Sequence, residues 1–332
     1  MPSPFRLALL AALLLLAGCG GGGGAGGESK SSERRITDAN ERTVTVPAQP
    51  ERVVALSEPT LDGLLALGVK PVATTAGRGQ SDISTYMAER AAGIPSVGAL
   101  GRPNLERLAS LRPDLILLDG TSTQDDALVD KLGRIAPTVY VSRTGENWRT
   151  AFSSLAGVLG LKARGEARLA DFDARVAEIK RRLAANAGAK VSVVRWSGIG
   201  LPATLLQELA VSRVLKQLGL TRPAGQLRRG PGHSVPVSLE NLDQLDGDWL
   251  FFASLGAGGS GPGTTPGSAG VKASELAFEI ASELRTFRTL RAYRERRVVP
   301  VDGSAWTSAG GLLAEHVVLD DVERSLAAGS GG

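Results

Sequence analysis

The sequence predicts an α/β protein with two doubly wound lobes joined by a single long helix. The chain has 332 residues, more than one hydrophobic core usually holds, so two domains are expected. Short apolar runs alternate with segments of helical spacing, which is typical of parallel sheets. One helix–turn–strand pattern also occurs twice, which predicts two similar, Rossmann-like lobes.

The repeated pattern runs over residues 104–118 and again over residues 238–252. In each copy, leucines at positions i, i+3 and i+6 place three apolar side chains on one face of a short helix. The turn sequences Arg-Pro-Asp and Asp-Gly-Asp end these helices. The four apolar residues after each turn predict a strand that is buried on both faces.

The first lobe is predicted to cover residues 36–145. Gly68 is a C-terminal stop for its first helix. The expected strands are 53–56, 71–75, a brief one at 97, 115–118 and 138–141, and the expected helices are 61–67 and 104–111. Strands that alternate with helices in this way indicate βα units in a parallel sheet.

Residues 146–188 are predicted to form the connecting helices. Apolar residues from Trp148 to Leu159 step by 4, 3 and 4, and Gly160 ends that helix. A second helix over 163–187 would run for roughly 37 Å at 1.5 Å per residue, long enough to join the lobes as a rigid spine. A coiled-coil partner helix is the alternative, but five apolar steps fall short of a sustained heptad array.

The second lobe is predicted to cover residues 189–332. Its expected strands are 191–194, 249–252 and 297–301, and its expected helices are 204–218, the repeat copy at 238–245, 275–294 and a terminal helix through Val318 and Val322. Residues 256–270 are rich in Gly, Pro, Ser and Thr and predict a loop.

The N-terminal residues predict export and a lipid anchor. Residues 1–18 combine Arg6 with a ten-residue apolar run, too short to span a bilayer, as in a signal peptide. Leu16-Ala17-Gly18-Cys19 resembles the lipobox of bacterial lipoproteins, which makes Cys19 the predicted lipidation site. An ordinary cleavage site and a plain membrane anchor are the alternatives. Residues 19–35, glycine-rich and then polar, predict the lipidated cysteine and a flexible linker. The expected location is the outer face of the cytoplasmic membrane.

Composition excludes several kinds of site. A net charge of +4 argues against a nucleic-acid partner. Cys19 is the only cysteine, so neither a disulfide nor a cysteine-based metal site is expected, and His233 and His316 are too few for a zinc or manganese site. No Gly-x-Ser-x-Gly elbow, Walker A sequence or Gly-x-Gly-x-x-Gly after a strand occurs, and we expect no catalytic residue.

Arginines at predicted strand ends indicate the ligand-binding residues. In open parallel sheets, ligands bind beyond the carboxyl ends of the strands. Arg78, Arg102 and Arg195 stand at such ends, and guanidinium groups grip carboxylate or oxyanion oxygens bidentately. Trp196 and Trp306 are expected to add flat apolar walls. Chance is the alternative for each arginine, because the chain contains 30 of them.

Glu106 and Glu240 open the two repeated helices and have two interpretations. A glutamate near a helix start complements the helix dipole and completes a cap. A matched pair, one on each lobe, is also suited to dock onto two basic pockets of a symmetric partner.

The chain resembles the iron–siderophore and cobalamin substrate-binding proteins of ATP-driven (ABC) bacterial importers. The resemblance runs from Pro50 to Val322 and is most specific at three segments, 103–106 with 112–117, 237–240, and 301–303 followed by Trp306 and Gly310-Gly311. It implies two lobes joined by one rigid helix. It also implies that Glu106 and Glu240 dock on arginines of a permease dimer, and that Arg195-Trp196 and Trp306 meet a siderophore.

The resemblance implies a monomeric lipoprotein that captures a ferric siderophore between its lobes and delivers it to an ABC permease. Iron is then held only through the siderophore, with no cofactor on the protein. A haem or cobalamin receptor is the first alternative, with Tyr86, Tyr140 or His233 as axial ligand. Two further alternatives are an exported siderophore esterase, which would be an enzyme, and a surface adhesion module.

Overall fold

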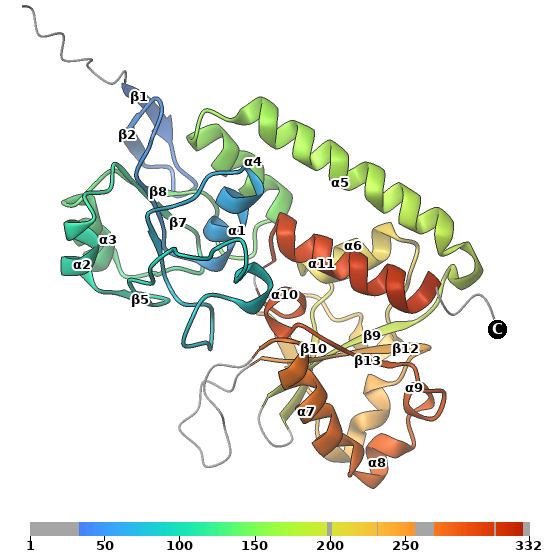
Figure 1. The fold of residues 1–332 in the computed structure, drawn as a ribbon. Coiled ribbons are helices and arrows are strands. Elements are labelled where there is room, and N and C mark those ends of the chain that lie inside the picture. Colours follow the sequence, from blue (N-terminus) through green and yellow to red (C-terminus); the bar gives the residue numbers. More distant parts are fainter. Residues whose placement is uncertain (1–32, 198–200, 231, 256–268, 309, 328–332) are drawn as a thin grey trace, which may run out of the picture. The chain divides into compact units, whose positions relative to one another are not determined.

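Two separate sheets organise the computed structural model (Figure 1). The structure describes residues 33–197, 201–230, 232–255, 269–308 and 310–327, so residues 1–32, including Cys19, lie outside the described residues. We call the four-stranded sheet with its helices the first lobe and the five-stranded sheet with its helices the second lobe. The predicted lobe boundaries stay predictions, because residues 32–332 form one compact unit.

The sheet of the first lobe consists of β3 (Val53–Ala55), β4 (Ala73–Thr74), β7 (Leu115–Leu118) and β8 (Thr138–Tyr140). All its pairings are parallel, as predicted, and the strand order is β4-β3-β7-β8. Leu115 and Leu117 join one core cluster, whereas Ile116 and Leu118 join another. Side chains alternate along a strand, so both faces of the sheet are buried. Helix α1 (Glu58–Ala66) supplies apolar side chains to the first cluster, and α2 (Leu105–Ser110) and α3 (Asp126–Gly133) supply the second.

Two antiparallel hairpins and a short helical turn complete the first lobe. They are β1 (Glu33–Thr37) with β2 (Thr43–Pro47), β5 (Gly98–Ala99) with β6 (Arg102–Pro103), and the 3₁₀ turn η1 (Thr85–Met87). The first hairpin corrects the predicted linker over 19–35, since residues 33–35 belong to β1. Its alternating pattern packs Ile36 and Val44 against the core and buries Val46 completely.

The sheet of the second lobe is mixed. It contains β9 (Val191–Ser197), β10 (Leu201–Leu205), β11 (Ser234–Pro236), β12 (Trp249–Ser254) and β13 (Val298–Val301), in the order β11-β10-β9-β12-β13. Strands β9, β12 and β13 pair in parallel as predicted, while β10 and β11 are antiparallel. The helical elements of this lobe are α6 (Ala210–Gln217), η3 (Ala224–Gln226), η4 (Leu239–Leu245), α7 (Val271–Ser282), α8 (Arg285–Arg288), α9 (Arg291–Arg294), α10 (Gly303–Trp306), α11 (Leu312–Val322) and the π-helical turn Glu323–Ala327.

Three predicted helices of the second lobe were wrong in detail. The helix expected over 204–218 begins only at Ala210, because its first residues belong to strand β10, which pairs with β9 over residues 201–204. The helix expected over 275–294 is broken into α7, α8 and α9, since Leu284 and Leu290 adopt extended backbone angles and turn Phe287 into the core. The second repeat copy is the 3₁₀ segment η4, with a non-helical residue at Asn241.

The aspartate of each repeat copy has the same structural role. Asp114 Oδ2 and Oδ1 accept hydrogen bonds from the backbone N–H groups of Glu51 (2.7 Å) and Arg52 (2.9 Å), just before β3. Asp248 Oδ2 accepts one from the N–H of Lys190 (2.8 Å), just before β9. The repeat therefore encodes a contact that holds the start of the neighbouring parallel strand.

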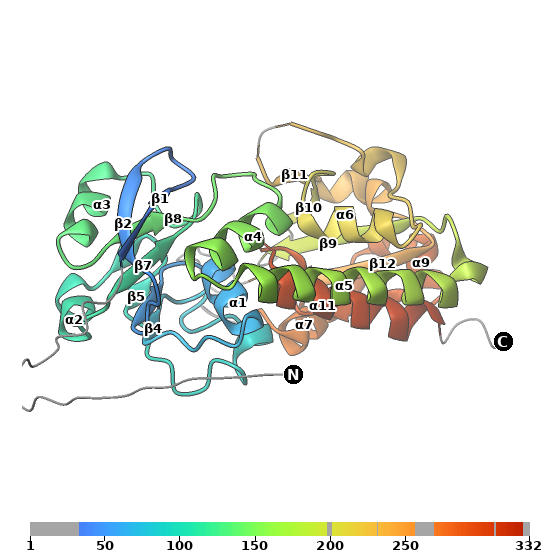
Figure 2. The ribbon, with the colours of Figure 1, turned by 90° about the horizontal axis from the view of Figure 1, so that it is seen from above.

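The connecting segment forms α4 (Trp148–Val158), α5 (Lys162–Arg182) and the turn η2 (Ala184–Asn186). Gly160 adopts a φ of +73°, which ends α4 at the position that the sequence predicts. Figures 1 and 2 show α5 running alongside α11 from the first lobe to the second. The single long helix is thus as expected, with its bounds at 162 and 182.

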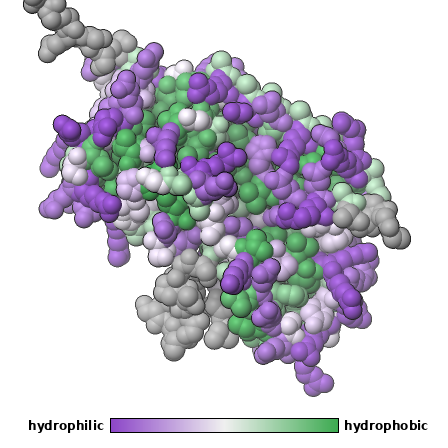
Figure 3. Space-filling model, viewed as in Figure 1, coloured by the Kyte–Doolittle hydropathy of each residue, from purple (hydrophilic) through white to green (hydrophobic). Residues whose placement is uncertain are grey.

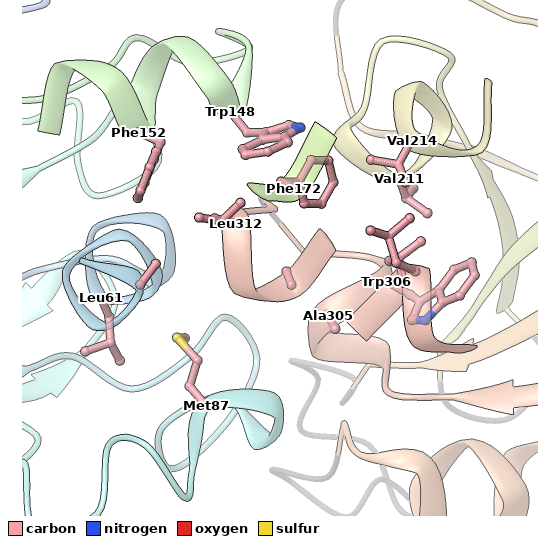
Figure 4. Close-up of a cluster of buried hydrophobic side chains, with 14 of the residues drawn as sticks. Leu61, Met87, Trp148, Phe152, Phe172, Val211, Val214, Ala305, Trp306 and Leu312 are labelled. Carbon is pink, nitrogen blue, oxygen red and sulfur yellow. The ribbon is translucent and has the colours of Figure 1, made fainter. Parts of the chain in front are cut away.

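One hydrophobic cluster spans both lobes and is centred on α11 (Figure 4). Leu312, Val318 and Leu319 of α11 are buried together with residues of both lobes. The neighbours shown in Figure 4 are Leu61 of α1, Phe152 of α4, Phe172 of α5 and Val211 and Val214 of α6. The last helix therefore belongs to the cores of both lobes, which makes the junction between them a packed interface.

A carboxylate from the first lobe caps this last helix. Asp62 of α1 is completely buried, and its two oxygens accept hydrogen bonds from the backbone N–H groups of Leu313 (2.9 Å) and Ala314 (3.0 Å). The cap position of α11 itself is Gly311, which has no side chain to do this. A second bond joins the lobes nearby, from the Ser308 hydroxyl to Glu58 Oε2 (2.6 Å).

Figure 3 shows polar side chains mixed with apolar areas over this face, and one apolar area lies over the second lobe in the region of α7. On that helix Leu276 is 55% exposed and Ile280 is 47% exposed, one helical turn apart. Among the described residues, no helix is long and apolar enough to cross a membrane.

Gly311→Ala should destabilise the protein by about 1–3 kcal/mol, because overpacking a tight site costs about that much. A Cβ at this position would lie 2.4 Å from Asp62 Cγ, while the φ of Gly311 is extended and adds no strain of its own. Urea unfolding followed by tryptophan fluorescence measures the free energy of unfolding.

Gly157→Ala is the matched control, because a Cβ there meets nothing within 4 Å inside α4. It should leave stability unchanged or raise it by up to about 1 kcal/mol. Equal stability of the Gly311→Ala protein and the unmodified protein would show that the Asp62 contact does not hold α11.

Candidate functional site

A cavity of about 890 Å³ lies between the two lobes. Its lining comes from α1, α4 and α6, from Arg195 near the end of β9, and from the segments that follow β4, β7, β8, β10 and α10. Most of these segments leave the carboxyl ends of parallel strands, where ligands of open α/β sheets bind. The volume is in the range of small-molecule sites.

Arg78 and Arg195 face this cavity, one from each lobe, as the sequence predicts. Both are half-buried, and neither has an ion pair among the described residues. Nε of Arg195 is buried without a hydrogen-bond partner in the part of the chain that the structure describes. Burial and the charge of Arg78 lower the pKa of Arg195. The two guanidinium groups therefore form a positive pair that an anion would stabilise.

The other charged groups at the cavity are already engaged. Arg143 Nη2 pairs with Glu41 at 2.6 Å, and Glu146 Oε2 accepts a hydrogen bond from the Arg143 N–H. Asp119 is buried, and its Oδ1 accepts bonds from the N–H and the hydroxyl of Thr121. Burial raises the pKa of Asp119 and raises that of Asp62 to about 6. Glu208 lies 3.8 Å from Arg229 Nε, and Arg213 Nε donates to the backbone oxygen of Glu208. Among the described residues, the cations of this lining without an ion pair are thus Arg78, Arg195 and Arg213.

Trp196 lies in the core and does not line the cavity, contrary to the sequence-based placement. It is 1% exposed and packs against Phe252 (5.4 Å between ring centroids) and Phe287 (6.0 Å). It follows Arg195 on β9, and successive side chains of a strand point to opposite faces. Because Arg195 faces the cavity, Trp196 faces away from it.

Trp306 and Arg102 are also placed away from the cavity lining. Trp306 is 1% exposed, stacks on Phe251 with ring centroids 4.4 Å apart, and donates its Nε1–H to Asp321 (2.8 Å). A satisfied, stacked indole of this kind is a core residue. Arg102 is exposed on the β5–β6 hairpin and is not among the residues that line the cavity.

Trp148 is the aromatic wall that sequence reasoning assigned only to helix packing. It is the first residue of α4, follows the cap residue Asn147, and lines the cavity with Phe152 and Leu155. The sequence did contain a signal for this role, because Trp148 comes directly after the segment that leaves β8, and such segments often carry site residues.

His233 is a further basic side chain of the lining. It is half-buried, its Nε2 lies 3.4 Å from the Ser308 carbonyl oxygen, and its Nδ1 has no partner among the described residues. Burial and the charges of Arg195 and Arg78 lower its pKa, so the ring is neutral near pH 7.

Tyr86 and Tyr140 do not line the cavity. The Tyr86 hydroxyl donates to Asp62 Oδ2 (3.1 Å), and the Tyr140 hydroxyl donates to the Thr123 carbonyl oxygen (3.0 Å). Within the described ranges, no group of three or more His, Cys, Asp or Glu side chains is arranged to hold a metal ion.

Glu106 and Glu240 are exposed at matched positions of the two lobes, on α2 and η4. Neither forms an ion pair with any residue that the structure describes. Their carboxylates are therefore available to a partner.

Comparison with known proteins agrees with this architecture. The family described as periplasmic binding protein matches residues 53–305. The probable siderophore-binding lipoprotein YfiY of Bacillus subtilis (strain 168) is 29% identical over 300 residues, covering 89% of this chain and 88% of YfiY. The Fe(3+)-citrate-binding protein YfmC of the same organism is 26% identical over 302 residues, covering 89% of this chain and 86% of YfmC.

The fold also matches solved structures. That of Staphylococcus aureus SirA complexed with staphyloferrin B superimposes with a TM-score of 0.71 at 24% identity, covering 88% of this chain and 98% of SirA. At this identity the match establishes the two-lobed fold.

Proposed function

This chain belongs to the periplasmic binding protein family, and on that premise we propose that it captures a ferric siderophore in the cavity between its lobes. The observation that carries the proposal is the pair Arg78 and Arg195, unpaired cations that face one cavity from opposite lobes. Relatives named for siderophore and Fe(3+)-citrate binding support the choice of ligand.

The charge of the site favours an anionic complex. Guanidinium groups bind carboxylate and other oxyanion oxygens through paired hydrogen bonds. Iron then arrives already coordinated by the siderophore, and the protein binds the outer oxygens of the complex and not the metal. Trp148 would pack against the apolar parts of such a ligand.

Arg195→Gln should weaken the binding of a ferric citrate or ferric catecholate complex at least about tenfold, because it removes one of two charge-assisted contacts. Trp148 lines the cavity, so quenching of tryptophan fluorescence measures the affinity. Arg102→Gln makes the same chemical change at an exposed position outside the lining and should leave affinity unchanged. Equal losses in both variants would refute the assigned role of Arg195.

Haem or cobalamin is the alternative ligand, and one observation favours it. His233 is the only one of the three proposed axial ligands that lines the cavity, and its neutral ring is suited to bind iron. Haemin and cobalamin belong in the same fluorescence titration. Micromolar or tighter quenching by haemin alone would replace the siderophore as the proposed ligand.

We propose capture and not hydrolysis of the siderophore. A hydrolase of the Ser–His type needs a serine hydroxyl bonded to a histidine ring. His233 contacts a backbone carbonyl instead, which supports a binding role. Steady turnover of a ferric siderophore by the purified protein would contradict this part of the proposal.

Delivery to an ABC permease dimer is the second part of the proposal, with Glu106 and Glu240 as the docking residues. E106K combined with E240K should leave siderophore affinity unchanged and abolish stimulation of ATP hydrolysis by the cognate permease in proteoliposomes. The control is E89K combined with E166K, which reverses the same number of charges at exposed glutamates outside the repeat. Full stimulation by the first variant would exclude the docking role.

Lipid anchoring at Cys19 and a monomeric state are the last parts of the proposal. Relatives named as lipoproteins support the anchor. Cys19→Ser should release the protein from the membrane fraction and abolish palmitate labelling, and retention on the membrane would contradict the anchor. Sedimentation of the released protein tests the monomeric state.

A further inference from the structure

A second hollow, of about 370 Å³, lies beside α6 in the second lobe. Four cationic residues line it: Arg213, Lys216, Arg222 and Arg229. The only acidic residue in its lining is Glu208. The hollow therefore concentrates an excess of three positive charges, in a chain whose formal net charge is +4.

Arg222 is the buried member of this group, at 7% exposure. Its Nη1 donates to Ser212 Oγ (2.6 Å) and its Nη2 donates to Gln226 Oε1 (2.5 Å), while its Nε has no partner within the described residues. No carboxylate pairs with it in that part of the chain. Burial lowers its pKa only to about 10, so the guanidinium keeps its charge at neutral pH.

Neutral groups hold this cation in place. The Gln226 amide nitrogen donates to Ser192 Oγ (2.7 Å) and to the Gln244 carbonyl oxygen (3.1 Å), which directs Oε1 of Gln226 toward Arg222. The network orients the guanidinium without neutralising it. A buried charge without a counter-charge is costly, and a bound anion would offset that cost.

The rim of the hollow carries cations with little local compensation. Lys216 is exposed, and its side chain has no hydrogen bond or ion pair among the described residues. Arg229 Nε contacts Gln207 Oε1 at 3.1 Å and lies 3.8 Å from Glu208 Oε1. Arg213 Nε donates to the backbone oxygen of Glu208 and not to its carboxylate.

We propose that this hollow binds a small oxyanion with two or three negative charges, held by Arg222 from within and by Lys216 and Arg229 at the rim. Its volume is at the lower end of the range for small-molecule sites. Hydrogenphosphate and citrate share the required chemistry, since both offer several oxygens to guanidinium and ammonium donors. Glu208 and Arg213 line both this hollow and the cavity between the lobes, so the two adjoin, but Lys216, Arg222 and Arg229 line only the hollow.

The test is titration of the iron-free protein with inorganic phosphate and, separately, with iron-free citrate. Calorimetry gives the affinity, and the NMR signal of the Arg222 Nε–H reports the site directly, because that group has no partner in the free protein. At least one anion should bind saturably and shift this signal. If only citrate does so, the ligand is a polycarboxylate, and if only phosphate does so, it is a phosphate group.

Lys216→Gln combined with Arg229→Gln should weaken the anion at least about tenfold, since both residues are exposed and their loss leaves the core intact. Lys131→Gln combined with Arg134→Gln, exposed on and just after α3, removes the same charge and should change nothing. Arg195→Gln should also leave this anion bound, because Arg195 belongs to the other cavity.

Arg222→Gln should abolish anion binding if this variant folds. If it does not fold, the rim variant, Lys216→Gln combined with Arg229→Gln, tests the proposal. The proposal is overturned if neither anion shifts the Arg222 signal. It is overturned equally if the rim variant binds as tightly as the unmodified protein, or if Arg195→Gln abolishes the binding.

Discussion

The carboxylate of Asp62 holds the N-terminus of α11, and the cavity depends on that contact because both elements line it. Removing a carboxylate from water is costly, and burial raises the pKa of Asp62 to about 6. Hydrogen bonds from two backbone N–H groups and from Tyr86 offset part of that cost. Around this polar contact, one apolar cluster joins helices of both lobes, so moving the lobes apart would expose side chains that are now fully buried. The helices at the base of the cavity are therefore held rigidly. The loops at its entrance can vary more readily in sequence and conformation.

That rigidity explains why an unpaired guanidinium pair is tolerated. Arg78 and Arg195 belong to different lobes, and the packed junction fixes the positions from which they face one cavity. A site whose charges are already positioned loses less entropy when a ligand binds. The same reasoning applies to Arg222, which Ser212 and Gln226 hold in one orientation. At both sites the positively charged groups are held in a fixed geometry, which favours the binding of an anion of matching shape.

Elements that follow from local sequence patterns could be predicted, whereas features that depend on long-range contacts could not. Strand β7, with four consecutive apolar residues, and the long helix α5 were predictable because each follows from local spacing. Arg195 was found because it stands near a strand end, and the same logic misplaced Trp196, since one step along a strand reverses the face. Strand β10 was missed because its pairing with β9 overrides local preference. The cap on α11 could not be predicted, because Asp62 and Leu313 are 251 residues apart in sequence.

The placement of α11 has a consequence for the order in which the molecule assembles. Residues from both ends of the chain meet at this helix, and contacts of such separation slow folding, because the intervening chain must be closed into a loop first. While the chain is being synthesised, α1 emerges long before the residues that cover it. Helix α4 and strand β3 cover part of its apolar side early, but the part that packs on α11 remains uncovered until almost the whole polypeptide has been made. A chain that stops short of residue 312 therefore lacks the helix that completes the cores of both lobes.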